Sequence, residues 1–100
     1  MSDVAVDWLA QEVRDLLGTS SVGLYEFIWL LRGRQPQVRS ADTHRIAKEA
    51  LQELLSDGDG RLVRLTWPSQ ISLGDVDPDS LRQSDWDDPR QGEPYVAMAL

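Results

Sequence analysis

This sequence of 100 residues contains no cysteine, no asparagine, one histidine and one lysine. Without cysteine the chain forms neither a disulfide nor a thiolate metal site, and a reducing compartment suits it. The single histidine, His44, rules out a metal centre built from several histidines of one chain. Nine arginines accompany the one lysine, a bias that is typical of a GC-rich bacterial genome.

Long hydrophobic runs are absent as well. No stretch approaches the roughly 18 apolar residues that a membrane-spanning helix needs, so we predict no membrane partner. An aspartate at position 3 stands where a signal peptide would carry positive charge. These features together predict a cytoplasmic protein.

The residues needed for catalysis are also scarce. The sequence has no glycine-rich phosphate loop and no nucleophile elbow, and His44 is the only histidine available as a general base. Asp75, Asp77 and Asp79 begin like a calcium loop, but Ser80 and Trp86 stand where that pattern requires glycine and glutamate. We therefore predict a non-enzymatic protein with no cofactor and no metal.

What the sequence does contain is enough apolar material for one core. Hydrophobic residues make up 41% of the chain, which indicates one folded domain over residues 1–100. Three segments, each followed by glycine, are predicted to be helices: in the first and third, apolar side chains recur at spacings of three and four, and the second is apolar on nearly all sides. The predicted helices begin near Val4, after Ser20 or Ser21, and at a capping Ser40, and they end at Gly18, Gly33 and Gly58.

Two strands are predicted after the helices. Residues 61–67 and 94–100 have the composition of strands, and each needs the other because a lone strand leaves its backbone groups unpaired. Residues 69–74 form a loop or a weak strand, and residues 75–94 form an acidic loop segment. The expected fold class is α+β, with a three-helix core, a small antiparallel sheet and an acidic C-terminal extension.

Residues 22–67 carry a resemblance to a known family. They contain a buried helix, "VGLYEFIWLLRG", then a capped helix, "SADTHRIAKEALQELLSDG", that runs into a strand, "RLVRLTW". This pattern resembles a winged helix-turn-helix domain, in which the recognition helix is followed along the chain by the strands of the wing. The resemblance implies a winged-helix-like core, and it implies that the helix predicted between Ser40 and Gly58 corresponds to the recognition helix.

Charge is spread unevenly along the chain and leads to two hypotheses. The net charge is −3 over residues 1–18, +1 over residues 19–74 and −5 over residues 75–100. We favour a module that binds a basic protein and neutralises or regulates it, as immunity proteins and antitoxins do, because acidic surfaces steer basic partners and repel nucleic acid. The predicted protein-binding residues are Asp75, Asp77, Asp79, Asp85, Trp86, Asp87 and Asp88.

The alternative is a winged-helix regulator that binds DNA. The predicted nucleic-acid contacts are Arg39, Thr43, His44, Arg45, Lys48, Arg61 and Arg64. Trp86 has two interpretations: it anchors a basic partner, or it packs the acidic loop onto the core. A third hypothesis is a homodimer that uses the first helix and Trp8.

Overall fold

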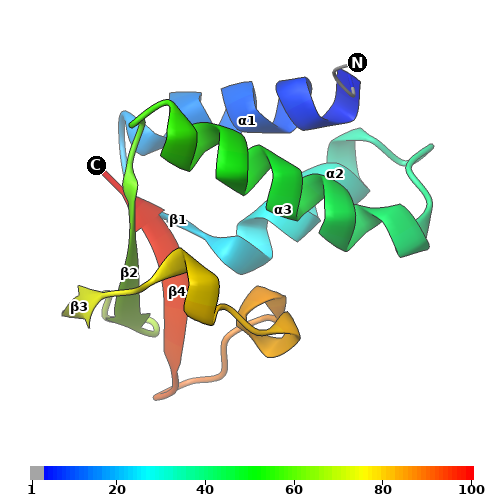
Figure 1. Ribbon diagram of the computed structural model, residues 1–100. Coiled ribbons are helices and arrows are strands. Elements are labelled where there is room, and N and C mark those ends of the chain that lie inside the picture. Colours follow the sequence, from blue (N-terminus) through cyan, green and yellow to red (C-terminus); the bar gives the residue numbers. More distant parts are fainter. Residues whose placement is uncertain (1–3) are drawn as a thin grey trace.

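The computed structural model describes residues 4–100 and has an α+β fold (Figure 1). Three helices pack against one antiparallel sheet of four strands, so the predicted fold class is confirmed. No helix in the described range is long and apolar enough to cross a membrane. The elements, with η for a short 3-10 helix, are α1 Val4–Leu17, β1 Val22–Gly23, α2 Leu24–Arg34, α3 Ser40–Ser56, β2 Arg61–Thr66, β3 Ser72–Asp75, η1 Pro78–Ser80, η2 Gln83–Trp86 and β4 Pro94–Ala99.

Helices α1 and α3 pack side by side through small residues. Ala10 of α1 and both Ala47 and Ala50 of α3 are fully buried, and the lack of bulky side chains lets the two backbones approach. The apolar periodicity of both segments is confirmed, because these residues lie on the buried faces of their helices. Leu16 departs from the pattern: it lies three residues after the buried Val13, but its side chain is 39% exposed.

The start of α2 differs from the prediction. Neither Ser20 nor Ser21 caps the helix; Val22–Gly23 form the short strand β1, and Gly23 is the capping residue. The Glu26 carboxylate accepts a hydrogen bond from the Gly23 amide at 3.0 Å, which satisfies a backbone donor at the helix start. The helix also continues through Gly33 to Arg34.

Helix α3 begins one residue away from the expected cap. Arg39 has an extended backbone and occupies the capping position without a side-chain capping hydrogen bond, while Ser40 is the first helical residue. The end of the helix near Gly58 is confirmed, since Asp57 follows its last residue and Gly58 takes a positive φ of 71°. Glycine adopts this conformation without the steric penalty that a side chain brings.

The C-terminal strand is a central element of the fold. The strand order is β1-β4-β2-β3, and β4 pairs antiparallel with both β1 and β2. The predicted pairing of residues 61–67 with 94–100 is confirmed over Arg61 to Thr66. The expected acidic C-terminal extension is not found, because the acidic residues 76–93 connect β3 to β4 inside the domain (Figure 1).

Each face of the sheet contributes to a separate apolar cluster. Leu62, Val96 and Met98 point into the main core with the three helices. Val63 and Tyr95 point to the opposite face, in a smaller cluster covered by partly buried side chains that include Trp67. This alternation follows from the two-residue period of a strand, and it divides the side chains of β2 between two surfaces.

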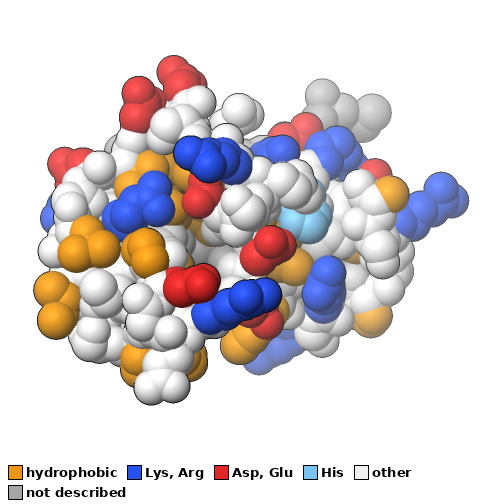
Figure 2. All heavy atoms as spheres, turned by 90° about the horizontal axis from the view of Figure 1, so that it is seen from below, with side chains coloured by type: hydrophobic (Ala, Val, Ile, Leu, Met, Phe, Trp, Pro, Cys, Tyr) orange, Lys and Arg blue, Asp and Glu red, His pale blue; other side chains and the backbone are white. Residues whose placement is uncertain are grey.

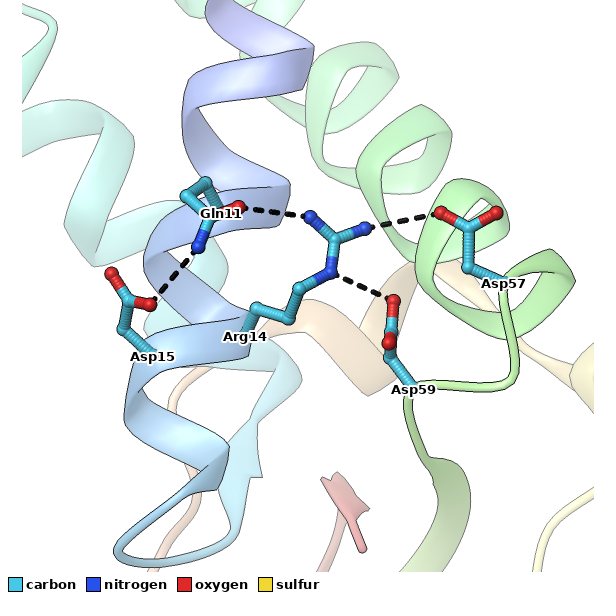
Figure 3. A network of polar contacts seen from close by, with 5 residues as sticks. All are labelled: Gln11, Arg14, Asp15, Asp57 and Asp59. Carbon is cyan, nitrogen blue, oxygen red and sulfur yellow. Dashed lines mark hydrogen bonds and ion pairs between the residues drawn. The ribbon is translucent and has the colours of Figure 1, made fainter.

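A polar network joins α1 to the turn between α3 and β2 (Figure 3). The Arg14 guanidinium donates to Asp59 at 2.7 Å and to Asp57 at 3.1 Å, and also to the side chain of Gln11. The hydrogen bond with Asp59 raises the pKa of Arg14 above its usual value. Arg14 thus connects segments that lie more than 40 residues apart in the sequence.

Candidate functional site

Five of the six acids in the predicted protein-binding set lie along the connection between β3 and β4, and the sixth, Asp75, is the last residue of β3. Two of them hold the connection in shape. Asp77 Oδ1 accepts from the Asp79 amide at 2.9 Å at the start of η1, and Asp85 Oδ2 accepts from the Arg82 amide at 2.7 Å at η2. A short side-chain oxygen that accepts from a nearby amide stabilises a turn in this way. The acidic segment is therefore structured by its own carboxylates.

Trp86 fixes the same connection to the helices. Its side chain is 2% exposed and packs edge-to-face against Phe27, with ring centroids 5.8 Å apart. The structure therefore places Trp86 in the core, not on the surface as a partner anchor. The physical reason is that an indole offers more apolar area than any other side chain on this segment. Its Nε1 donor is buried and has no hydrogen-bond partner among the described residues, which costs about 1–3 kcal/mol.

The other acids of the set differ in how far they are already engaged. Asp88 accepts a hydrogen bond at 2.9 Å from the indole of Trp29, and Asp75 forms an ion pair with Arg61 at 2.5 Å. Asp79 and Asp87 are exposed, and neither carboxylate forms an ion pair within residues 4–100. These two carboxylates are the ones most available to an incoming cation.

An open cleft of about 300 Å³ lies between α3 and the acidic connection. Leu51 and Leu55 of α3 form one wall, and Pro78 and Leu81 form the other. Trp86 also lines it, and the charged residues in its lining are Lys48 and Asp79. The cleft therefore combines an apolar lining with one charge of each sign.

The basic residues of the DNA-binding hypothesis do not gather into one surface. Arg45 is engaged by acids on its own helix, with Asp42 at 3.7 Å and Glu49 at 3.1 Å. Arg39, His44 and Lys48 remain at least partly exposed on or beside α3. Over residues 39–56 three basic and three acidic side chains cancel, whereas nucleic-acid interfaces carry a marked basic excess.

Three further members of the predicted nucleic-acid set are placed unfavourably. Thr43 is 3% exposed, and its hydroxyl donates to the Arg39 carbonyl at 3.2 Å, so it faces the core. Arg61 and Arg64 are three residues apart on β2 and therefore point to opposite faces of the sheet. Figure 2 shows the same mixing on one face of the molecule, where blue and red side chains are interleaved.

Some features of this surface were not predicted from the sequence. The structure brings Lys48, from the predicted nucleic-acid set, into the same cleft as Asp79, from the predicted protein-binding set. Residues 76–86 and 48–55 carry no local signal that they meet, because their pairing is a long-range contact. Within residues 4–100 no three or more Asp, Glu or His side chains are grouped to hold a metal ion.

The chain was compared with protein-family models, with curated proteins and with solved structures, and none of them matched.

Proposed function

We propose that this chain is a non-enzymatic protein-binding module that docks a basic partner through the acidic connection between β3 and β4. The observation that carries the proposal is the anchoring of this connection by Trp86, which holds exposed carboxylates on a structured segment. A binding surface that is already ordered loses less conformational entropy when a partner arrives. Neutralisation of a basic protein, as immunity proteins and antitoxins perform it, is the class of activity that fits.

Electrostatics supports this proposal in two ways. Residues 75–93 carry seven acids and two arginines, so the segment attracts basic surfaces and accelerates their encounter. The same charge repels the phosphates of nucleic acid. Because Asp77 and Asp85 are engaged in local turns, the contact with the partner falls mainly to Asp79 and Asp87.

The experiment is to neutralise these two carboxylates in the variant Asp79→Asn/Asp87→Asn. Partners captured by the wild-type protein from its own cells are purified, and their association rates are measured at several salt concentrations. We expect slower association and a weaker salt dependence for the variant, because rim charges act mainly on the encounter rate. The matched control is Asp7→Asn/Asp15→Asn, which removes the same charge from exposed positions of α1.

The proposal fails if the variant and the wild-type protein associate with every captured partner at the same rate and with the same salt dependence. It also fails if the control slows association as much as the variant does, because net charge alone would then explain the effect. Capture of no partner by the wild-type protein counts against it equally.

A second candidate function is binding of duplex DNA by a winged helix. Its support is the arrangement of elements: α2 and α3 are joined by residues 35–39, and α3 leads into β2, which pairs with β4. In this reading α3 enters the major groove. The cancelling charges on α3 and the burial of Thr43 weigh against it.

Fluorescence anisotropy with a labelled random-sequence duplex at low salt separates the two candidates. Protein binding without DNA binding predicts no change in anisotropy. DNA binding predicts an affinity that falls steeply as salt is raised, with a slope set by the number of phosphates contacted. In that case Lys48→Gln and Arg39→Gln should each reduce the slope of the logarithm of affinity against the logarithm of salt concentration by about one.

A further inference from the structure

The cleft between α3 and η1 has the features of a site for one side chain of a partner. Its volume of about 300 Å³ lies at the lower end of the range of ligand pockets. Leu51, Leu55 and Leu81 give it an apolar interior, and Trp86 lines it as well. An aliphatic side chain that enters the cleft therefore leaves water for apolar contacts on several sides.

The charges of the cleft restrict what enters it. Lys48 is contributed by α3 and Asp79 by η1. No ion pair joins these two residues, and neither pairs with another residue in the described part of the chain. An occupant with a cation on the η1 side and an anion on the α3 side complements both charges.

The indole of Trp86 provides an observable for the cleft. Its Nε1 is a buried donor without an acceptor in residues 4–100, although buried polar groups nearly always have a partner. The residue lines the cleft, so its indole resonance reports whether the cleft is occupied.

From the apolar lining and the two charges that are unpaired within residues 4–100 we infer that the cleft binds a short partner segment whose apolar side chain lies between a basic and an acidic residue. The basic residue pairs with Asp79 and the acidic residue with Lys48. This inference rests on the proposed function and adds the sequence character of the partner. The carboxylates of the connection offer no apolar contact, and the cleft supplies one. Such a contact matters because central apolar anchors dominate the binding energy of most interfaces.

The probe is the peptide acetyl-Arg-Leu-Glu-amide, titrated into the ¹⁵N-labelled full chain. The readout is the indole Nε1–H resonance of Trp86, assigned by its loss in Trp86→Phe. We expect a saturable shift of this resonance with a dissociation constant of about 1 mM, which is typical of a contact made by few groups. The indole resonance of Trp29, which donates to Asp88 outside the cleft, should stay in place.

Two sets of controls test the apolar and the charged parts separately. Acetyl-Arg-Ala-Glu-amide should bind several-fold more weakly because it lacks the aliphatic anchor. Lys48→Glu should weaken acetyl-Arg-Leu-Glu-amide about fivefold and restore binding to acetyl-Arg-Leu-Lys-amide, because the charge pair is then reversed. The matched control is Arg39→Glu, an equal charge change at an exposed position outside the cleft, which should have neither effect.

Three outcomes overturn the inference. The first is a Trp86 resonance that does not shift in a saturable way. The second is equal binding of the leucine and alanine peptides. The third is a Lys48→Glu variant that does not bind acetyl-Arg-Leu-Lys-amide. If the peptide does not bind but Asp79→Asn/Asp87→Asn loses the captured partners, the cleft is not the binding site and the acidic connection remains as the binding surface. Peptide binding with unchanged capture refutes the proposed function instead.

Discussion

Replacing Trp86 with alanine tests whether one indole holds the acidic connection on the helices. Trp86 is 2% exposed and lies against Phe27. A buried tryptophan removes up to about 250 Å² from water, which at about 25 cal/mol per Å² amounts to about 6 kcal/mol. The β-carbon that remains and the partly compact unfolded chain both reduce this value. We therefore expect Trp86→Ala to lower the free energy of unfolding by about 3–5 kcal/mol.

The variant Trp86→Phe separates packing from hydrogen bonding. The Trp86 Nε1 donor has no partner within residues 4–100, so phenylalanine loses some apolar area but removes an unsatisfied buried donor. The second change is favourable by about 1–3 kcal/mol and offsets most of the first. We expect the free energy of unfolding of Trp86→Phe to lie within about 1 kcal/mol of the wild-type value.

The assay is urea unfolding followed by far-ultraviolet circular dichroism, since fluorescence would change with the substitution itself. The control is Trp29→Ala, which removes a 54% exposed indole and its hydrogen bond to Asp88. We expect a cost of about 1 kcal/mol for this control. The reasoning is refuted if Trp86→Ala costs no more than Trp29→Ala, because the connection would then not depend on the buried indole.

Further predictions concern the backbone, the tyrosines and Arg14. Gly60→Ala should destabilise the protein by about 1–3 kcal/mol, because a Cβ there would lie 2.9 Å from the Ala99 carbonyl oxygen. At Gly33 an added Cβ meets nothing within 4 Å, so Gly33→Ala should stabilise α2 by about 0.5–1 kcal/mol. Thermal unfolding of both variants tests the two expectations. Burial, reinforced by the charge of Glu26, raises the pKa of Tyr25 and of Tyr95 above 10.0. The folded state therefore holds these protons more tightly, and stability that is fully present below pH 10.0 falls as the pH rises through the raised values. Unfolding free energies measured across this range should decline less in Tyr25→Phe/Tyr95→Phe, and an equal decline would contradict the assignment. Arg14→Gln should cost about 1 kcal/mol at low salt and less at high salt, because its ion pairs with Asp57 and Asp59 are partly exposed; a cost that does not depend on salt would show that packing dominates.

The helices are the part of this fold that follows most directly from the sequence. The buried faces of α1 and α3 repeat every three to four residues, as Leu9 and Val13 or Leu51 and Leu54 illustrate, and this period is a local property. The start of α2 was missed because Val22 continues the apolar run into the helix, although it pairs with Met98 in the sheet. Only a partner strand more than 70 residues away identifies Val22 as part of a strand.

The candidate site divides in the same way. The acidic character of residues 75–93 and the mixed charge of α3 are properties of composition, and both are visible without a structure. The opposite directions of Arg61 and Arg64 also follow from the strand period alone. The cleft beside Lys48 and the burial of Trp86 could not be derived, because neither the approach of η1 to α3 nor the contact with Phe27 leaves a periodic signal in either segment.

The sequence by itself thus determined the helices, the β2–β4 pairing and the excess of acid near the C-terminus, since local periodicity, backbone pairing and charge count decide these. The tertiary structure alone decided that β4 lies in the middle of the sheet and that the acidic connection folds back over α2 and α3. The physical reason is that Trp86 gains more from burial against Phe27 than from exposure to water, and the site of its burial depends on chain segments distant in sequence.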